Sequence, residues 1–197
     1  TGGEGDYRTI LENGNVEGFA LMLGPNEKFY ATIQNQTGWT TVDGTTIVDL
    51  NTWYNVAVTH TTNSIKIYVN GEVDGETTGS FGDIINNDGE LFIGRYHEYE
   101  NYFIGNIDEV SLWDIALTQE EIQTSMFTDS TIYQPDLVAQ WKFNANDGST
   151  LFDHSGNQNH GTINGATWDG EGFTRPNTSV TFAVNMRDYI ESEGDSL

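Results

Sequence analysis

The sequence predicts an all-β protein, an antiparallel sandwich of two sheets with one short helix. Its composition is the first reason: Gly, Asn, Asp and Thr are abundant and aromatic residues make up 12% of the 197 residues, as in short strands joined by tight turns. Its pattern is the second, because segments of alternating apolar residues follow one another too closely to leave room for crossover helices. Neighbouring strands should therefore run antiparallel.

Turn signals and alternation place the strands. Asn-Gly dipeptides, which tolerate positive φ at both positions, predict hairpins at residues 13–14, 70–71 and 164–165. Strands are expected at 18–24, 28–35, 53–60, 64–70, 89–96, 104–114, 137–143 and 160–168. In the segment 65–69, Ile65, Ile67 and Val69 share one face, which fixes the register of that strand.

One helix is expected near residues 118–126. Thr118 can cap it and Glu121 stands three residues on, which forms a capping box. Farther along, the polar residues 169–178, with Gly and Pro, predict a linker. We expect residues 1–168 to form one module and residues 179–197 to begin a following β module.

The order of these motifs resembles a known family. A Trp opens the strand at 53, an Asn-Gly hairpin follows at 70–71, and Gly-x-Ile-Asp-Glu-Val at 105–110 precedes a Trp and the capped helix. Over residues 7–168 the chain resembles a laminin-G-like module of the concanavalin A-like lectin/glucanase class, close to its pentraxin branch. The resemblance implies a jelly-roll sandwich whose opening strands lie upstream of Thr1.

The resemblance also leaves one question about the segment 137–168. It is similar to the segment that commonly starts such modules, yet here it follows the helix. It either closes this module or is the remnant of a second copy, and we favour closure. The tail at 179–197 resembles the opening strand of modules in secreted bacterial multi-module chains, so we expect a secreted or cell-surface parent protein, its signal upstream and other modules of the same chain as neighbours.

Charge and composition exclude several functions. Thirty acidic residues against seven Lys and Arg give a net charge of −23, which repels nucleic acid and anionic membranes. No Cys is present, so disulfides, thiolate zinc sites and Cys nucleophiles are excluded. No apolar run reaches the ~20 residues of a membrane span, so no membrane insertion is expected. Many carboxylates favour Ca²⁺, which prefers oxygen ligands, as the metal to consider.

The loop at 95–103 is the main candidate site, although a solvated hairpin tip is the alternative. Its rings and a distant Trp offer faces for sugars: these ligand-binding candidates are Tyr96, His97, Tyr99, Tyr102 and Trp39. By resemblance to the calcium loop of pentraxins, Ca²⁺ would be held by Glu98, Glu100 and Asn101, with Asp6 or Glu4 completing the shell.

Two other acidic segments have competing interpretations. Glu72, Asp74 and Glu76 resemble by their letters the catalytic run of laminarinase-type hydrolases, and in a regular strand they would share one face at steps of roughly 7 Å. Gly75 and the hairpin context argue against catalysis there. Asp153, Asn157 and Asn159 could hold a small cation, or they could brace a turn through bonds to the backbone.

We therefore expect a non-catalytic extracellular recognition module that binds glycan or another extracellular ligand such as a protein, with calcium as a possible aid. A glycoside hydrolase of the same fold and a structural spacer are the alternatives. The fold alone does not identify the ligand.

Overall fold

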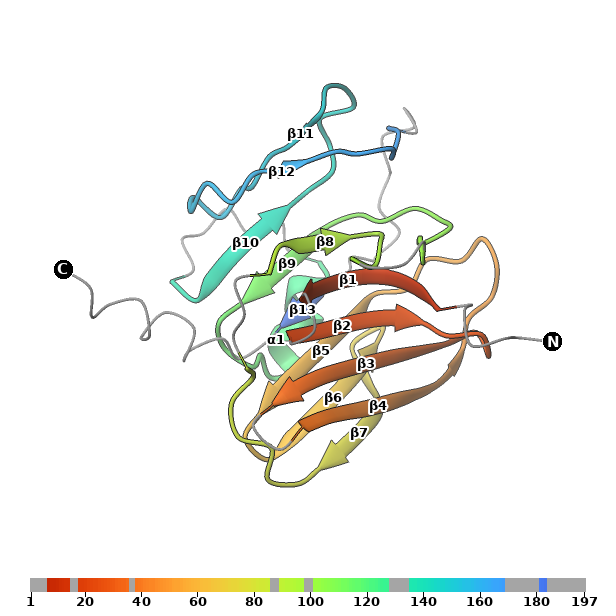
Figure 1. Ribbon diagram of the computed structural model, residues 1–197, viewed down its shortest axis with the longest axis vertical. Helices are drawn as coiled ribbons and strands as arrows, with labels where there is room; N and C mark the ends of the chain where they lie inside the picture. The colour runs from red at the N-terminus through yellow and green to blue at the C-terminus, as the bar shows by residue number, and fades with distance from the viewer. Residues whose placement is uncertain are drawn as a thin grey trace.

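The front layer of the protein is a five-stranded antiparallel sheet (Figure 1). The computed structural model describes residues 7–14, 18–35, 38–85, 89–97, 101–127, 135–168 and 181–183. The sheet has the order β4-β3-β2-β1-β8, with β1 (Arg8–Gly14), β2 (Gly18–Leu23), β3 (Lys28–Asn35), β4 (Gly38–Ile47) and β8 (Leu91–Ile93).

The back layer consists of two short sheets. One has the order β5-β6-β7, with β5 (Val56–Thr61), β6 (Ser64–Val69) and β7 (Glu72–Thr78). The other has the order β10-β9-β13, with β9 (Val110–Trp113), β10 (Leu137–Trp141) and β13 (Thr181–Ala183). β13 lies beside β5 and joins the two sheets into one layer (Figure 1). The predicted antiparallel jelly-roll sandwich is thus confirmed.

The core lies between the two layers. Alternation along β2 and β3 turns one face of each strand inward, and the predicted inward set of β6, Ile65, Ile67 and Val69, is buried. The side chains that fill this space include Leu11, Leu21, Ile33, Val56, Val58, Ile65, Ile67, Val110 and Trp141.

The helix covers the outer face of the back layer. α1 (Gln119–Ser125) begins at Thr118 with the predicted capping box, a motif that contributes about 1 kcal/mol. Its Ile122 packs with Ala57 and Tyr68, which point away from the core. β5 is therefore buried on both faces, which explains why neither face of its sequence is cleanly polar. No described helix is long and apolar enough to span a membrane.

Several strands are shorter than predicted. The segment 89–96 forms only β8, because Gly94 has φ 79°, and the segment 104–114 forms only β9, because Glu109 has φ 51°. The hairpin at 70–71 is confirmed by φ values of 51° and 79°. The hairpin predicted at 164–165 is wrong, since β12 (Gly161–Thr162) is brief and pairs with β11 (Thr150–Leu151), and no strand follows it up to residue 168.

The two ends of the sandwich differ. Between β4 and β7 the backbones approach so closely that a Cβ on Gly75 would lie 2.3 Å from the carbonyl oxygen of Asp43. Asp74 joins these strands by accepting hydrogen bonds from Thr45 and Thr46. At the opposite end, β8 and β10 do not pair with each other.

Two segments after the helix pair with β9. β10 lies antiparallel to it, and Ala139 and Trp141 of β10 enter the core. Residues 181–183 pair with β9 in parallel, at an edge that offers unpaired backbone groups. The division into one module, a linker and a following module stays a prediction, as does the closure of the module by the segment 137–168. The rest of the stretch 179–197 and the linker 169–178 lie outside the described residues.

Candidate functional site

The chain crosses the outer face of the front sheet after it leaves β8. Gly94 adopts positive φ there, and its N–H donates to the carbonyl oxygen of Ile10 at 2.9 Å. On the return, Phe103 N–H donates to the carbonyl oxygen of Gly94 at 2.9 Å, and Thr9 N–H donates to that of Asn101 at 3.3 Å. The described residues on either side of the candidate loop are thus hydrogen-bonded to β1 and to each other.

A buried carboxylate lies beneath this loop. Glu12 lies opposite Phe92 of β8, faces away from the core and is 3% exposed. Its Oε2 accepts from the N–H of His97 at 2.9 Å, and its Oε1 pairs with His97 Nδ1. Burial raises the pKa of Glu12 above its usual value, and the bonds from His97 and the charge of Arg95 offset only part of that effect.

Sequence reasoning missed Glu12, although a signal was present. It is the one carboxylate in the segment "RTILENG", which was not predicted as a strand. A carboxylate is rarely buried in a strand without a partner. His97, its partner, is 85 residues away in the chain, so only the tertiary fold identifies the pair.

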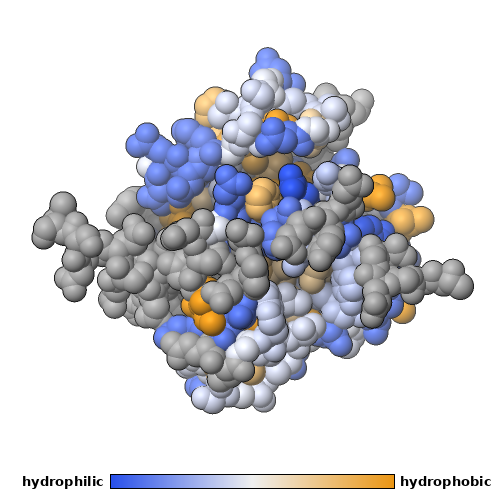
Figure 2. Space-filling view, viewed as in Figure 1, coloured by the Kyte–Doolittle hydropathy of each residue, from blue (hydrophilic) through white to orange (hydrophobic). Residues whose placement is uncertain are grey.

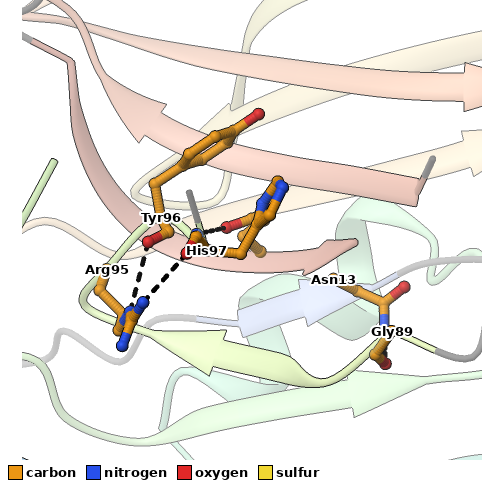
Figure 3. Close-up of polar contacts among 6 residues, drawn as sticks. Asn13, Gly89, Arg95, Tyr96 and His97 are labelled. Carbon is orange, nitrogen blue, oxygen red and sulfur yellow. Dashed lines mark hydrogen bonds and ion pairs between the residues drawn. The ribbon is translucent and has the colours of Figure 1, made fainter. Parts of the chain in front are cut away.

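Arg95 holds the loop from the other side. Its Nε donates to the carbonyl oxygen of Tyr96 at 3.3 Å, and its Nη2 donates to that of His97 at 3.1 Å. The guanidinium carbon lies 4.9 Å from the centre of the Phe92 ring, within range of a cation–π contact. Figure 3 shows Arg95 reaching back to both carbonyls, with the rings of Tyr96 and His97 on the far side of the loop.

A groove of about 870 Å³ opens beside Arg95, between β8, β10 and the β11–β12 hairpin. We call it the β8 groove. Its lining residues include Asn13, Phe92, Arg95, Trp141, Phe143, Thr162 and Asn164. Figure 2 shows hydrophobic side chains at the bottom of the hollow below the upper lobe, which in Figure 1 is the β11–β12 region.

The wall of the groove formed by residues 153–160 is braced by one carboxylate. Asp153 accepts hydrogen bonds from the N–H groups of Gln140, Ser155 and Asn159 and from the Ser155 hydroxyl, at 2.8 to 2.9 Å. Burial alone would raise the pKa of Asp153, but these four bonds lower it below the usual value. The structure therefore favours the turn interpretation, since both carboxylate oxygens accept hydrogen bonds from backbone N–H groups.

The side-chain amides of this segment also form hydrogen bonds with the backbone. Asn157 Nδ2 donates to the carbonyl oxygens of Leu137 and Val138 at 2.9 Å, and Asn159 Nδ2 donates to that of Val138 at 2.9 Å. These bonds cap the outer edge of β10, which would otherwise present unpaired carbonyls. These hydrogen bonds attach the groove wall to β10.

The predicted catalytic carboxylates do not share one face. The pairing of β6 with β7 shifts at Asp74, so Glu72 lies opposite Val69 and Glu76 lies opposite Lys66, on opposite faces of β6. Each also has a structural partner: Glu72 accepts from Gln119 of α1 at 2.8 Å, and Glu76 lies 3.3 Å from Lys66. This geometry does not form the carboxylate pair that glycosidic cleavage requires.

The predicted sugar-stacking rings are separated. Trp39 is 54% exposed on β4, three strands and roughly 14 Å from β1. Tyr102 is 52% exposed beside Thr9, whereas Tyr96 packs on His97 with ring centres 4.6 Å apart. The structure groups Tyr96, His97 and Tyr102 around β1 and leaves Trp39 apart. Tyr99 lies outside the described residues.

The calcium site falls largely outside the described residues, which omit Glu98, Glu100, Glu4 and Asp6. Asn101 is described and is half-buried. Within the described part of the chain, no group of three or more His, Asp or Glu side chains could hold a metal ion. The calcium interpretation stays a prediction.

Comparison with known proteins supports the fold. A family model described as the concanavalin A-like lectin/glucanases superfamily matches residues 2–123. The crystal structure of a candidate carbohydrate-binding protein from Bacteroides ovatus has a TM-score of 0.69 at 24% identity, over 83% of this chain and 50% of that one. This chain thus spans half of that protein's length.

A second crystal structure has lower similarity. It is that of an S-layer domain-containing protein from Clostridium thermocellum, with a TM-score of 0.30 at 21% identity, over 64% of this chain and 65% of that one. This score is too low to support a structural argument. No curated protein matches the sequence.

Proposed function

Because the chain belongs to the concanavalin A-like lectin/glucanase superfamily, we propose that it is a non-catalytic recognition module that binds carbohydrate in the β8 groove. The single observation that carries the proposal is the groove itself, which combines apolar rings with hydrogen-bonding groups. Its volume of about 870 Å³ lies within the range of small-ligand sites.

The chemistry of the lining suits a sugar. Phe92 and Phe143 offer ring faces for the apolar C–H surface of a pyranose, while Asn13, Glu90 and Asn164 offer groups that bond its hydroxyls. Glu90 and Asn164 are exposed in the groove, and a ligand with hydroxyls can bond them whereas a purely apolar ligand cannot. A ligand with both ring faces and hydroxyls satisfies both parts of the groove.

We further propose that the module belongs to a larger secreted or cell-surface protein. The chain spans half the length of the candidate carbohydrate-binding protein from Bacteroides ovatus, which supports a larger parent protein. Calcium at Glu98, Glu100 and Asn101 belongs to the same proposal, since Ca²⁺ prefers carboxylate and carbonyl oxygens.

A glycan array tests the function, with one variant that fills the groove. Ala166 lines the groove and is exposed, so Ala166→Trp should obstruct the groove without removing any core contact. Ser80→Trp adds the same ring at an exposed position that does not line the groove. We expect glycan binding by the native chain and by Ser80→Trp, and loss of binding by Ala166→Trp at unchanged Tm.

Two results would contradict the proposal. If no glycan on the array binds, the spacer alternative is favoured. If the chain hydrolyses laminarin and Glu72→Gln abolishes that activity, the module is an enzyme despite the register of β7.

A further inference from the structure

Arg95 is one of the few cations in this acidic chain. Against 30 acidic residues the sequence has only seven Lys and Arg. Arg8 and Lys66 form ion pairs with Glu27 and Glu76, but no described carboxylate lies within ion-pair distance of Arg95. Nearby Glu12 has both carboxylate oxygens engaged by His97.

The guanidinium is held in place before any ligand arrives. Two main-chain carbonyls and the Phe92 ring fix it, and these contacts use only Nε and one hydrogen of Nη2. Arginine has five N–H donors, and no described residue accepts a hydrogen bond from the other three, which include both hydrogens of Nη1. The N–H groups of a planar guanidinium match the two oxygens of a carboxylate. Because the Arg95 side chain is already held in place, it loses little conformational entropy on binding.

We propose that the ligand of the β8 groove carries a carboxylate that binds Arg95, which makes it an acidic sugar of the uronic acid class. This inference rests on the proposed function and narrows it. Phe92 lies below the guanidinium and also lines the groove, so the same ligand can contact the ring and the guanidinium.

The surrounding charges limit how many acidic sugars are favoured. Glu90 and Asp114 also line the groove, and they repel further carboxylates. The net charge of −23 opposes a polyanion at long range, although salt at 0.15 M screens this beyond about 8 Å. The arrangement therefore favours one uronic acid next to neutral sugars, or a short acidic oligomer, over a long polyanion.

Isothermal titration with a matched pair of ligands tests the inference. Trigalacturonate and its fully methyl-esterified form share a backbone and differ only in the carboxylates. The native chain should bind the acid roughly 10- to 100-fold more tightly than the ester, the range typical of a charge-assisted hydrogen-bonded pair. Arg95→Gln and Arg95→Lys should remove most of that preference for the acid over the ester; Lys keeps the charge but lacks the planar guanidinium that binds a carboxylate through two hydrogen bonds.

Arg8→Gln is the matched control, since it makes the same change in charge at a residue that pairs with Glu27 and does not line the groove. It should keep the preference for the acid. Equal affinity for acid and ester, or a preference that survives in Arg95→Gln, would overturn the inference and leave glycan recognition intact.

Three other outcomes of these titrations would also count against the inference or the proposed function. If Arg95→Gln weakens both ligands equally, Arg95 only positions the loop, and the inference is wrong. If neither ligand binds while a neutral glycan on the array does, the ligand is not acidic. Failure of every glycan would instead overturn the proposed function itself.

Discussion

His60 should make the stability of this protein depend on pH. It lies on β5 in line with Val56 and Val58, is 2% exposed, and faces the core opposite Ile65. Neither ring nitrogen has a hydrogen-bond partner among the described residues. Burial without a partner disfavours the charged imidazolium and lowers the pKa of His60 from 6.5 to about 4.

The direction and size of the effect follow from linkage. Above pH 6.5 His60 is neutral in both the folded and the unfolded state, so it adds no pH dependence. Between pH 6.5 and about 4 the unfolded chain binds a proton that the folded chain excludes, so the free energy of unfolding falls as the pH falls. The difference between a pKa of 6.5 in the unfolded chain and about 4 in the folded chain corresponds to about 3 kcal/mol of the free energy of unfolding. This stability is lost as the pH falls through that window.

Urea unfolding of three proteins at pH 7.5, 5.5 and 4.2 measures the effect. His60→Leu should lose about 3 kcal/mol less than the native protein between the first and last pH. His154→Gln, which removes an exposed His, should follow the native curve. If the His60→Leu and native curves run parallel, His60 is not held neutral by the core and the reasoning is wrong.

Three further predictions concern carboxylates. Asp153→Ala should lower the free energy of unfolding by about 3 kcal/mol in urea, because four donors lose an anionic acceptor. Asp74→Ala should lower the free energy of unfolding by about 2 kcal/mol in the same assay. Glu76→Gln breaks one surface ion pair and should change that free energy by no more than about 0.5 kcal/mol. Equal effects of the two variants would contradict this ranking. Calcium should raise Tm in the native chain and not in Glu98→Ala/Glu100→Ala, and titration without heat of binding would refute the metal site.

The candidate site was only partly predictable. Sequence reasoning identified the loop with Tyr96 and His97, because rings and carboxylates are concentrated there. It did not find Glu12, because the sequence around a carboxylate in a strand does not show which distant segment will pack over it. It also treated Glu72 and Glu76 as one face, since the shift in pairing at Asp74 depends on how closely β4 and β7 approach.

Local pattern alone determined the sandwich, the hairpin at 70–71 and the capped helix, because alternation, φ preference and capping act between residues near in sequence. Tertiary structure alone decided that the helix covers β5 and that β10 pairs with β9. It also decided that Arg95, Asn13 and Phe143 line one groove. These outcomes depend on which sheet edges and faces come into contact. Such contacts join residues far apart in the chain, so the sequence pattern of any one segment does not reveal them.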